Sequence, residues 1–136
     1  MKKNLEEIKS ERGDTIAIII RRDYGEEGIN FVSEPGNPFQ LGVLKHQAGY
    51  VVKPHIHNKI LKKNKENQEF IFVVSGEVEA DLYDNERLIK TITLYEGDAL
   101  LQTSGGHGFR VKKLSKLIEI KQGPFYGTEK EKTYIG

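Results

Sequence analysis

The chain contains no cysteine among its 136 residues, which excludes disulfide bonds, thiolate metal sites and a cysteine nucleophile. Long apolar runs are also missing. The most apolar window, IAIII at 16–20, is far shorter than the roughly 20 residues that a membrane-spanning helix needs. The charged stretch at 1–14 has no apolar run behind it that would make a signal peptide. We therefore expect a soluble cytoplasmic protein that does not bind a membrane.

The chain also lacks an excess of either charge. Its 21 basic and 20 acidic residues give a net charge of +1, so nothing favours nucleic acid or an anionic membrane as a partner. A length of 136 residues is typical of one domain with a core of its own. The sequence therefore predicts a single domain, 1–136.

Short runs rich in β-branched and aromatic residues make up most of the chain, and turn signals separate them. This spacing is typical of an all-β sandwich or barrel. The predicted strands cover residues 14–22, 40–46, 50–57, 69–76, 77–84, 88–97, 98–104, 107–114 and 116–123.

The remaining segments are predicted as connections or ends. Residues 3–11 are the only candidate for a short helix, and 23–39, with its glycines and two prolines, is a predicted loop. The tripeptide SGE at 75–77 and the stretch YDNER at 83–87 predict tight hairpin turns. The polar tail at 128–136 predicts a solvated end.

Strand alternation assigns faces to the side chains. In 77–84 the apolar side chains fall on one face and the acidic ones on the other, so one face is buried and one is wet. Four potential metal ligands fall on faces of this kind, and three imidazoles and a carboxylate converge if those faces line one interior: His55, His57, Glu69 and His107. This set suits Zn, Fe, Mn, Ni or Cu and does not choose between them.

The same residues carry a resemblance to the cupin family. That family's first motif is Gly, five residues, His-x-His, a few residues, Glu, six residues and Gly. Here Gly49 is followed after five residues by His55 and His57, and Glu69 is followed after six by Gly76. A second motif begins with glycine and reaches a histidine, as Gly97 and His107 do. The resemblance covers 49–111, about half of the chain.

The resemblance implies a double-stranded β-helix, or jelly-roll barrel, that binds one divalent metal ion. The implied ligands are His55, His57, Glu69 and His107. The chain departs from the family where eleven residues, 58–68, separate His57 from Glu69 and where Thr103 replaces a proline. The second motif's histidine also comes one residue early, and its asparagine position is not occupied.

Two questions about the ligands and their surroundings stay open at this point. Glu66 competes with Glu69 as the carboxylate ligand, and Glu69 is preferred for its spacing to Gly76 and its place at the start of a strand. The insert 58–68 is either a solvated loop or a lid over an anionic ligand, in which case Lys62 and Lys63 are candidate contacts.

Residues near the C-terminus add candidate substrate contacts. Glu119 and Lys121 share one strand face, and they bind a ligand if that face points inward but are ordinary surface residues if it points outward. Tyr126 is a candidate at one end of the barrel. The phrases SGGHGF at 104–109 and IEIKQGPFYG at 118–127 resemble small cupins associated with surface-polysaccharide and nucleotide-sugar pathways.

Two classes of function follow from the resemblance. The first is a metal-dependent enzyme acting on a small polar or anionic molecule, such as a sugar derivative, by isomerase, epimerase, lyase or dioxygenase chemistry. The second is a non-catalytic module that binds or senses a ligand. A metal-free epimerase that uses a His–carboxylate pair is disfavoured by four convergent ligands. The resemblance also suggests a homodimer, with the strand at 14–22 as an exposed apolar edge that pairs across the interface.

Overall fold

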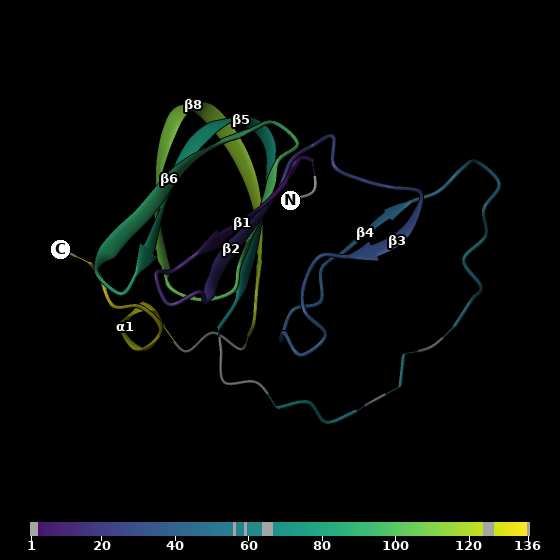
Figure 1. The fold of residues 1–136 in the computed structure, drawn as a ribbon, viewed down its shortest axis with the longest axis horizontal. Coiled ribbons are helices and arrows are strands. Elements are labelled where there is room, and N and C mark those ends of the chain that lie inside the picture. The colour runs from purple at the N-terminus through teal and green to yellow at the C-terminus, as the bar shows by residue number, and fades with distance from the viewer. Residues whose placement is uncertain (1–2, 56, 59, 64–66, 124–126, 136) are drawn as a thin grey trace. The chain divides into compact units, whose positions relative to one another are not determined.

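The computed structural model describes residues 3–55, 57–58, 60–63, 67–123 and 127–135. The chain forms two compact units (Figure 1). Unit 1 consists of Met1–Tyr24 and Asn67–Gly136, and unit 2 consists of Gly25–Glu66. Unit 2 is therefore an excursion of the chain between two segments that build unit 1 together.

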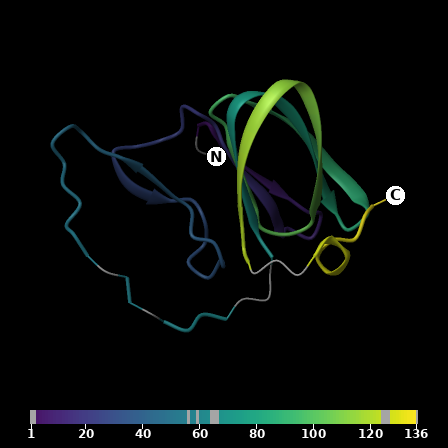
Figure 2. The same cartoon turned by 180° about the vertical axis from the view of Figure 1, so that it is seen from behind.

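Unit 1 is an antiparallel sheet that curls into a half-barrel (Figures 1 and 2). The sheet runs in the order β1-β2-β7-β5-β6, and β8 pairs with β5. Most of the predicted strands of this unit are confirmed. The strands are β1 (Leu5–Lys9), β2 (Thr15–Ile20), β5 (Glu69–Asp84), β6 (Arg87–Tyr95), β7 (Ala99–Gln102) and β8 (Gly106–Lys121).

The long strands β5 and β8 form the main ladder of the sheet. Their pairing begins with Glu69 opposite Lys121 and ends with Tyr83 opposite Gly106. The predicted hairpin at 75–77 is wrong, because β5 passes through these residues without turning. Gly76 instead has a positive φ of 98° and lies where the register shifts, so the glycine makes a bulge within a continuous strand. The predicted separate strands 107–114 and 116–123 likewise join into β8.

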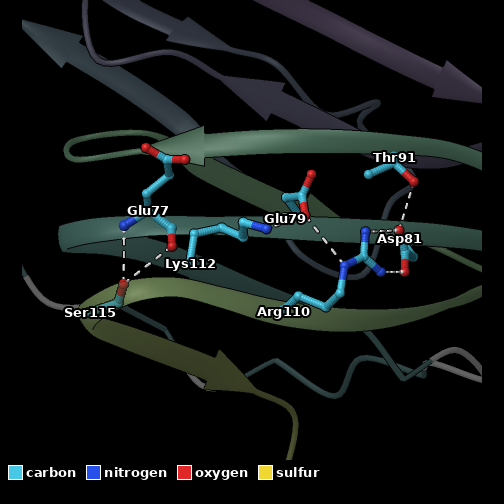
Figure 3. A network of polar contacts seen from close by, with 7 residues as sticks. All are labelled: Glu77, Glu79, Asp81, Thr91, Arg110, Lys112 and Ser115. Atoms are coloured by element: carbon cyan, nitrogen blue, oxygen red, sulfur yellow. Dashed lines mark hydrogen bonds and ion pairs between the residues drawn. The ribbon is translucent and has the colours of Figure 1, made fainter.

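Ser115 of β8 packs tightly against the bulge. A Cβ added to Gly76 would lie 2.1 Å from Ser115 Oγ and 2.6 Å from Ser115 Cα. The Ser115 hydroxyl accepts a hydrogen bond from the Glu77 N–H at 3.0 Å (Figure 3). It donates one to the Lys113 carbonyl at 2.7 Å. Residue 76 must therefore be glycine for both its backbone conformation and this close approach.

The core lies on the concave inner face of the sheet. Val78, Ala80 and Leu82 are fully buried there, as the alternation in β5 predicts. Burial of one such valine or leucine contributes about 1.5–3 kcal/mol. The other buried apolar members of this cluster are Ile8, Ile16, Ala17, Ile19, Val73, Ile92, Leu94 and Leu100.

The acidic face of β5 is held by cross-strand polar contacts (Figure 3). Arg110 of β8 donates to both carboxylate oxygens of Asp81 and, at 3.3 Å, to Glu79. Thr91 of β6 donates its hydroxyl to Asp81 at 2.6 Å, and Lys112 Nζ lies 3.4 Å from Glu79. This network joins three neighbouring strands on the face opposite the core.

The predicted helix at 3–11 is wrong, because Leu5–Lys9 forms strand β1. The spacing of Leu5 and Ile8 is compatible with a helix, but pairing with β2 buries Ile8 and overrides it. This outcome also corrects the assignment of 14–22 as an exposed edge. β2 lies between β1 and β7, and its Ile16–Ile20 side chains are buried. A homodimer stays a prediction, but β2 cannot pair with a partner's strand.

Unit 2 contains one small antiparallel sheet. Its strands are β3 (Gly28–Phe31) and β4 (Gly42–Lys45), so the predicted loop at 23–39 contains a strand and the strand predicted at 40–46 is confirmed. The strand predicted at 50–57 is wrong, since its described residues are not in a strand. Pro54 explains this, because it lacks an N–H to donate and restricts the residue before it.

The C-terminal tail is mostly exposed, as predicted, but it also contains the four-residue helix α1 (Thr128–Glu131). None of the helical structure in the described part of the chain is long and apolar enough to span a membrane.

Candidate functional site

The strand register sets Glu69 and His107 on the inner face of unit 1. Glu69 begins β5 and shares a face with buried Ile71. His107 lies directly opposite Leu82, and directly opposed residues of an antiparallel pair have side chains on the same face. Both predicted ligands therefore point toward the concave side of the sheet.

The two side chains meet at this face. His107 Nε2 lies 3.3 Å from Glu69 Oε2, and about a quarter of each side chain is exposed. Two ligands that each bind one metal ion at roughly 2.1 Å and subtend an angle of about 90–110° lie roughly 3.0–3.4 Å apart. The separation of these two atoms fits two ligands of one ion.

Gln102 of β7 orients the imidazole ring. Its side-chain nitrogen donates to the main-chain carbonyls of Ile16, at 3.2 Å, and Ser104. Its oxygen therefore faces His107 Nδ1 at 2.9 Å, and the ring must donate there. The proton on Nδ1 leaves the Nε2 lone pair directed at Glu69, as in histidines whose second nitrogen binds a metal.

Burial keeps this ring neutral. Desolvation lowers the pKa of His107 below its ordinary value of 6.5, and it outweighs the charges of Glu69 and Glu119, which raise that pKa. Lys132 lowers the pKa further. A neutral ring with its proton on Nδ1 sets a lone pair against a carboxylate oxygen. A cation between the two atoms would convert this repulsion into two attractive contacts.

His55 and His57 lie in unit 2. Their ring centroids are 4.9 Å apart, and both side chains are exposed. His55 Nδ1 donates to the Lys53 carbonyl at 2.7 Å, so His55 also keeps Nε2 for another partner. The four predicted ligands thus come as two pairs, one in each unit. The described residues contain no group of three or more histidine, cysteine, aspartate or glutamate side chains that could hold a metal ion.

The strand register assigns a face to two of the C-terminal candidates. Glu119 lies opposite Ile71 and Lys121 lies opposite Glu69, so this polar pair is on the inner face of the sheet. Ile118 and Ile120 are on the outer face, where about half of each side chain is exposed. Both Glu119 and Lys121 are nevertheless exposed, so their role as substrate contacts stays a prediction.

The other predicted site residues belong to unit 2 or lie outside the described residues. Lys62 and Lys63 are exposed in unit 2, in a segment without strand or helix, as expected for the insert. Tyr126 and Glu66 lie outside the described residues. The alternative of Glu66 as the carboxylate ligand therefore stays a prediction.

A small cavity of about 50 Å³ adjoins Glu69. It is lined by Asn67, Gln68, Glu69, Lys121, Gln122 and Lys132. Gln68 is buried, with its Nε2 donating to the Thr103 carbonyl at 3.1 Å. The Gln122 side-chain oxygen accepts from the Gln68 N–H at 2.7 Å.

Sequence reasoning missed two residues of this region. Gln102 had a signal, because it is the one polar residue at the end of the otherwise apolar strand β7. Lys132 had none, since it lies in a polar tail whose course depends on tertiary structure.

A comparison with family models, curated proteins and solved structures finds no match to this chain.

Proposed function

We propose that this chain is a cupin-type metalloprotein that binds one divalent ion through His55, His57, Glu69 and His107. We further propose that it is a metal-dependent enzyme acting on a small polar or anionic molecule, such as a sugar derivative. The ion is one of Zn, Fe, Mn, Ni or Cu, since nitrogen and carboxylate ligands suit all of them.

The contact chain from Gln102 through His107 to Glu69 is the observation that carries the proposal. A structural histidine needs a partner for each nitrogen, but here the Nε2 lone pair of a neutral ring faces an acceptor at 3.3 Å. Two such groups on adjoining strands of one curled sheet make a rigid half-site for a cation. His55 also carries its proton on Nδ1, which supports a second half-site formed by His55 and His57.

The fold adds support at a coarser level. A curled antiparallel half-barrel with its polar groups at one end of the concave face is compatible with a small jelly-roll barrel. The motif glycine Gly76 also occupies a position that only glycine fits well. We therefore propose that unit 1 has the architecture of a double-stranded β-helix.

In the proposed mechanism the chain's own residues bind and orient the substrate. When bound, the ion would act as a Lewis acid that polarises a substrate oxygen. Gln102 holds the ring of His107 in one tautomer, and Lys121 presents a positive charge beside Glu69. Glu119 lies on the same face and close enough to raise the pKa of His107, so it is the candidate group for accepting a substrate proton.

A non-catalytic binding or sensing module is the second candidate. The cavity beside Glu69 measures about 50 Å³, whereas typical ligand sites measure about 300–1,000 Å³. A site of this size favours a protein that holds an ion with a small counter-anion over one that encloses a sugar.

Elemental analysis of the purified protein tests the proposal. We expect one divalent ion per chain, lost in the His55→Ala/His57→Ala double variant and in His107→Ala, while the β-rich circular dichroism spectrum is retained. His46→Ala is the matched control, because His46 stacks on Tyr50 at 3.8 Å and is not a proposed ligand. Full metal content in the double variant, or equal loss in the control, would contradict the proposal.

A further inference from the structure

The cavity beside Glu69 brings together side chains from both ends of the C-terminal segment. Lys121 ends strand β8, and Lys132 follows helix α1. Both line the same cavity although ten residues lie between them in the sequence. The tail therefore turns back after α1, so that the Lys132 ammonium group lies at the same cavity as that of Lys121.

Lys132 lies beyond α1 in the C-terminal tail and still lines this cavity. The tail therefore contributes a charged group to the lining, and it is more than a solvated end.

The local charges leave room for one anion. Among the side chains that line the cavity, Glu69 contributes one negative charge and Lys121 and Lys132 contribute two positive charges, so the lining carries an excess of positive charge. A divalent ion held at Glu69 would increase this excess. An anionic group in the cavity would offset it, and Lys121 and Lys132 are the charged donors of the lining.

The cavity sets the size of that group. Its volume of about 50 Å³ is well below the roughly 300–1,000 Å³ of typical ligand sites, so it suits a headgroup such as a carboxylate or phosphate better than a whole sugar. The lining includes the ammonium groups of Lys121 and Lys132 and the side-chain amides of Asn67 and Gln122. The buried Gln68 amide donates to the Thr103 carbonyl.

We infer that Lys121 and Lys132 form an anion-binding subsite that takes the carboxylate or phosphate group of the ligand next to the proposed metal ion. The inference rests on the proposed function for the ion, but the subsite itself belongs to this chain's own residues. Lys132 is the charged group that the C-terminal tail contributes to this subsite.

Titration calorimetry with inorganic phosphate and, separately, acetate tests the inference, using EDTA-treated protein before and after one equivalent of Mn²⁺. We expect Mn²⁺ to tighten anion binding by the wild type. Lys132→Gln and Lys121→Gln should weaken it about tenfold without changing the Mn²⁺ content, since a charge-assisted contact is lost. Lys130→Gln is the matched control, because Lys130 is an exposed lysine of α1 that does not line the cavity.

Each outcome separates the subsite from the metal site. If the protein binds no Mn²⁺ but Lys132→Gln still weakens phosphate or acetate binding, the subsite stands and the proposed function fails. If Mn²⁺ binds and Lys132→Gln behaves like Lys130→Gln, the subsite is wrong and the metal site stands. Tighter binding of phosphate than of acetate assigns the subsite to a phosphate, and the reverse order assigns it to a carboxylate.

Discussion

Glu69 and His107 stand at opposite ends of the β5–β8 ladder, yet their side chains meet at 3.3 Å. Glu69 pairs with Lys121 at one end of the ladder, and His107 pairs with Leu82 near the other. The two ends meet only because the strand pair curls back on itself, with β7 joining them through Gln102. The site is therefore a product of sheet curvature.

The bulge at Gly76 interrupts this ladder, and bulges bend a strand and increase its twist. We expect Gly76→Ala to lower the free energy of unfolding by about 2 kcal/mol or more, because a Cβ collides with Ser115 and the positive φ is strained. Its metal affinity should fall as well, measured by competition with a chromophoric chelator.

Gly13→Ala is the matched control for that variant. Gly13 has a similar φ of 92°, but a Cβ there meets no other atom within 4 Å among the described residues. Its cost should be limited to backbone strain of about 1–2 kcal/mol, with metal affinity unchanged. Equal effects of both alanines on metal binding would show that the bulge does not shape the site.

Gln102→Leu should weaken metal binding about 10–100-fold, because the ring of His107 loses the acceptor that fixes its tautomer. The measurement is a metal titration at constant pH. Gln68→Leu is the control for loss of a buried amide, since Gln68 is equally buried but bonds Thr103 and not His107. If the two variants lose metal affinity equally, the hydrogen bond to His107 has no orienting role.

Acid should destabilise the fold through Asp81. The Arg110 and Thr91 hydrogen bonds lower the pKa of Asp81 below its ordinary value of 3.8. A lowered pKa in the folded state contributes stability that is fully present above the ordinary value and is lost as the pH falls through the lower one. Urea unfolding between pH 2 and 7 should therefore show a decline that begins near about pH 4–5.

Asp81→Asn should reduce stability at neutral pH and flatten part of that decline, because its side chain does not titrate. Glu86→Gln supplies the control, since this carboxylate lies at the exposed β5–β6 turn outside the network. An unchanged pH profile in Asp81→Asn would assign the acid sensitivity to other carboxylates.

Local pattern was enough to predict most strands of unit 1 and the inner face of its sheet. Alternation in β5 correctly buried Val78, Ala80 and Leu82, and it aligned Glu69 with the core-facing side chains. Two of the errors share a physical cause, since they concern tertiary pairing. Leu5–Lys9 became a strand because β2 offers it an edge, and the glycine at 76 makes a bulge because β8 continues beside it.

The site could be predicted only as a set of residue types. The spacing of histidines and carboxylates suggested ligands, and the register of β5 and β8 then brought Glu69 and His107 together. Gln102 and Lys132 could not be assigned, because one acts through a hydrogen bond across strands and the other through the course of the tail. Such contacts depend on curvature, which a linear pattern does not encode.

The curled ladder also has a kinetic consequence. Strand β2 pairs with β7, and β5 pairs with both β7 and β8, so the sheet is held by partners far apart in the chain. Sheets of this kind fold slowly, in about milliseconds to seconds, because the entropy of closing long loops opposes each pairing. The ends of the ladder meet only after its curvature is complete. A bound ion should therefore slow unfolding while leaving the refolding rate nearly unchanged, since its site is absent from the transition state.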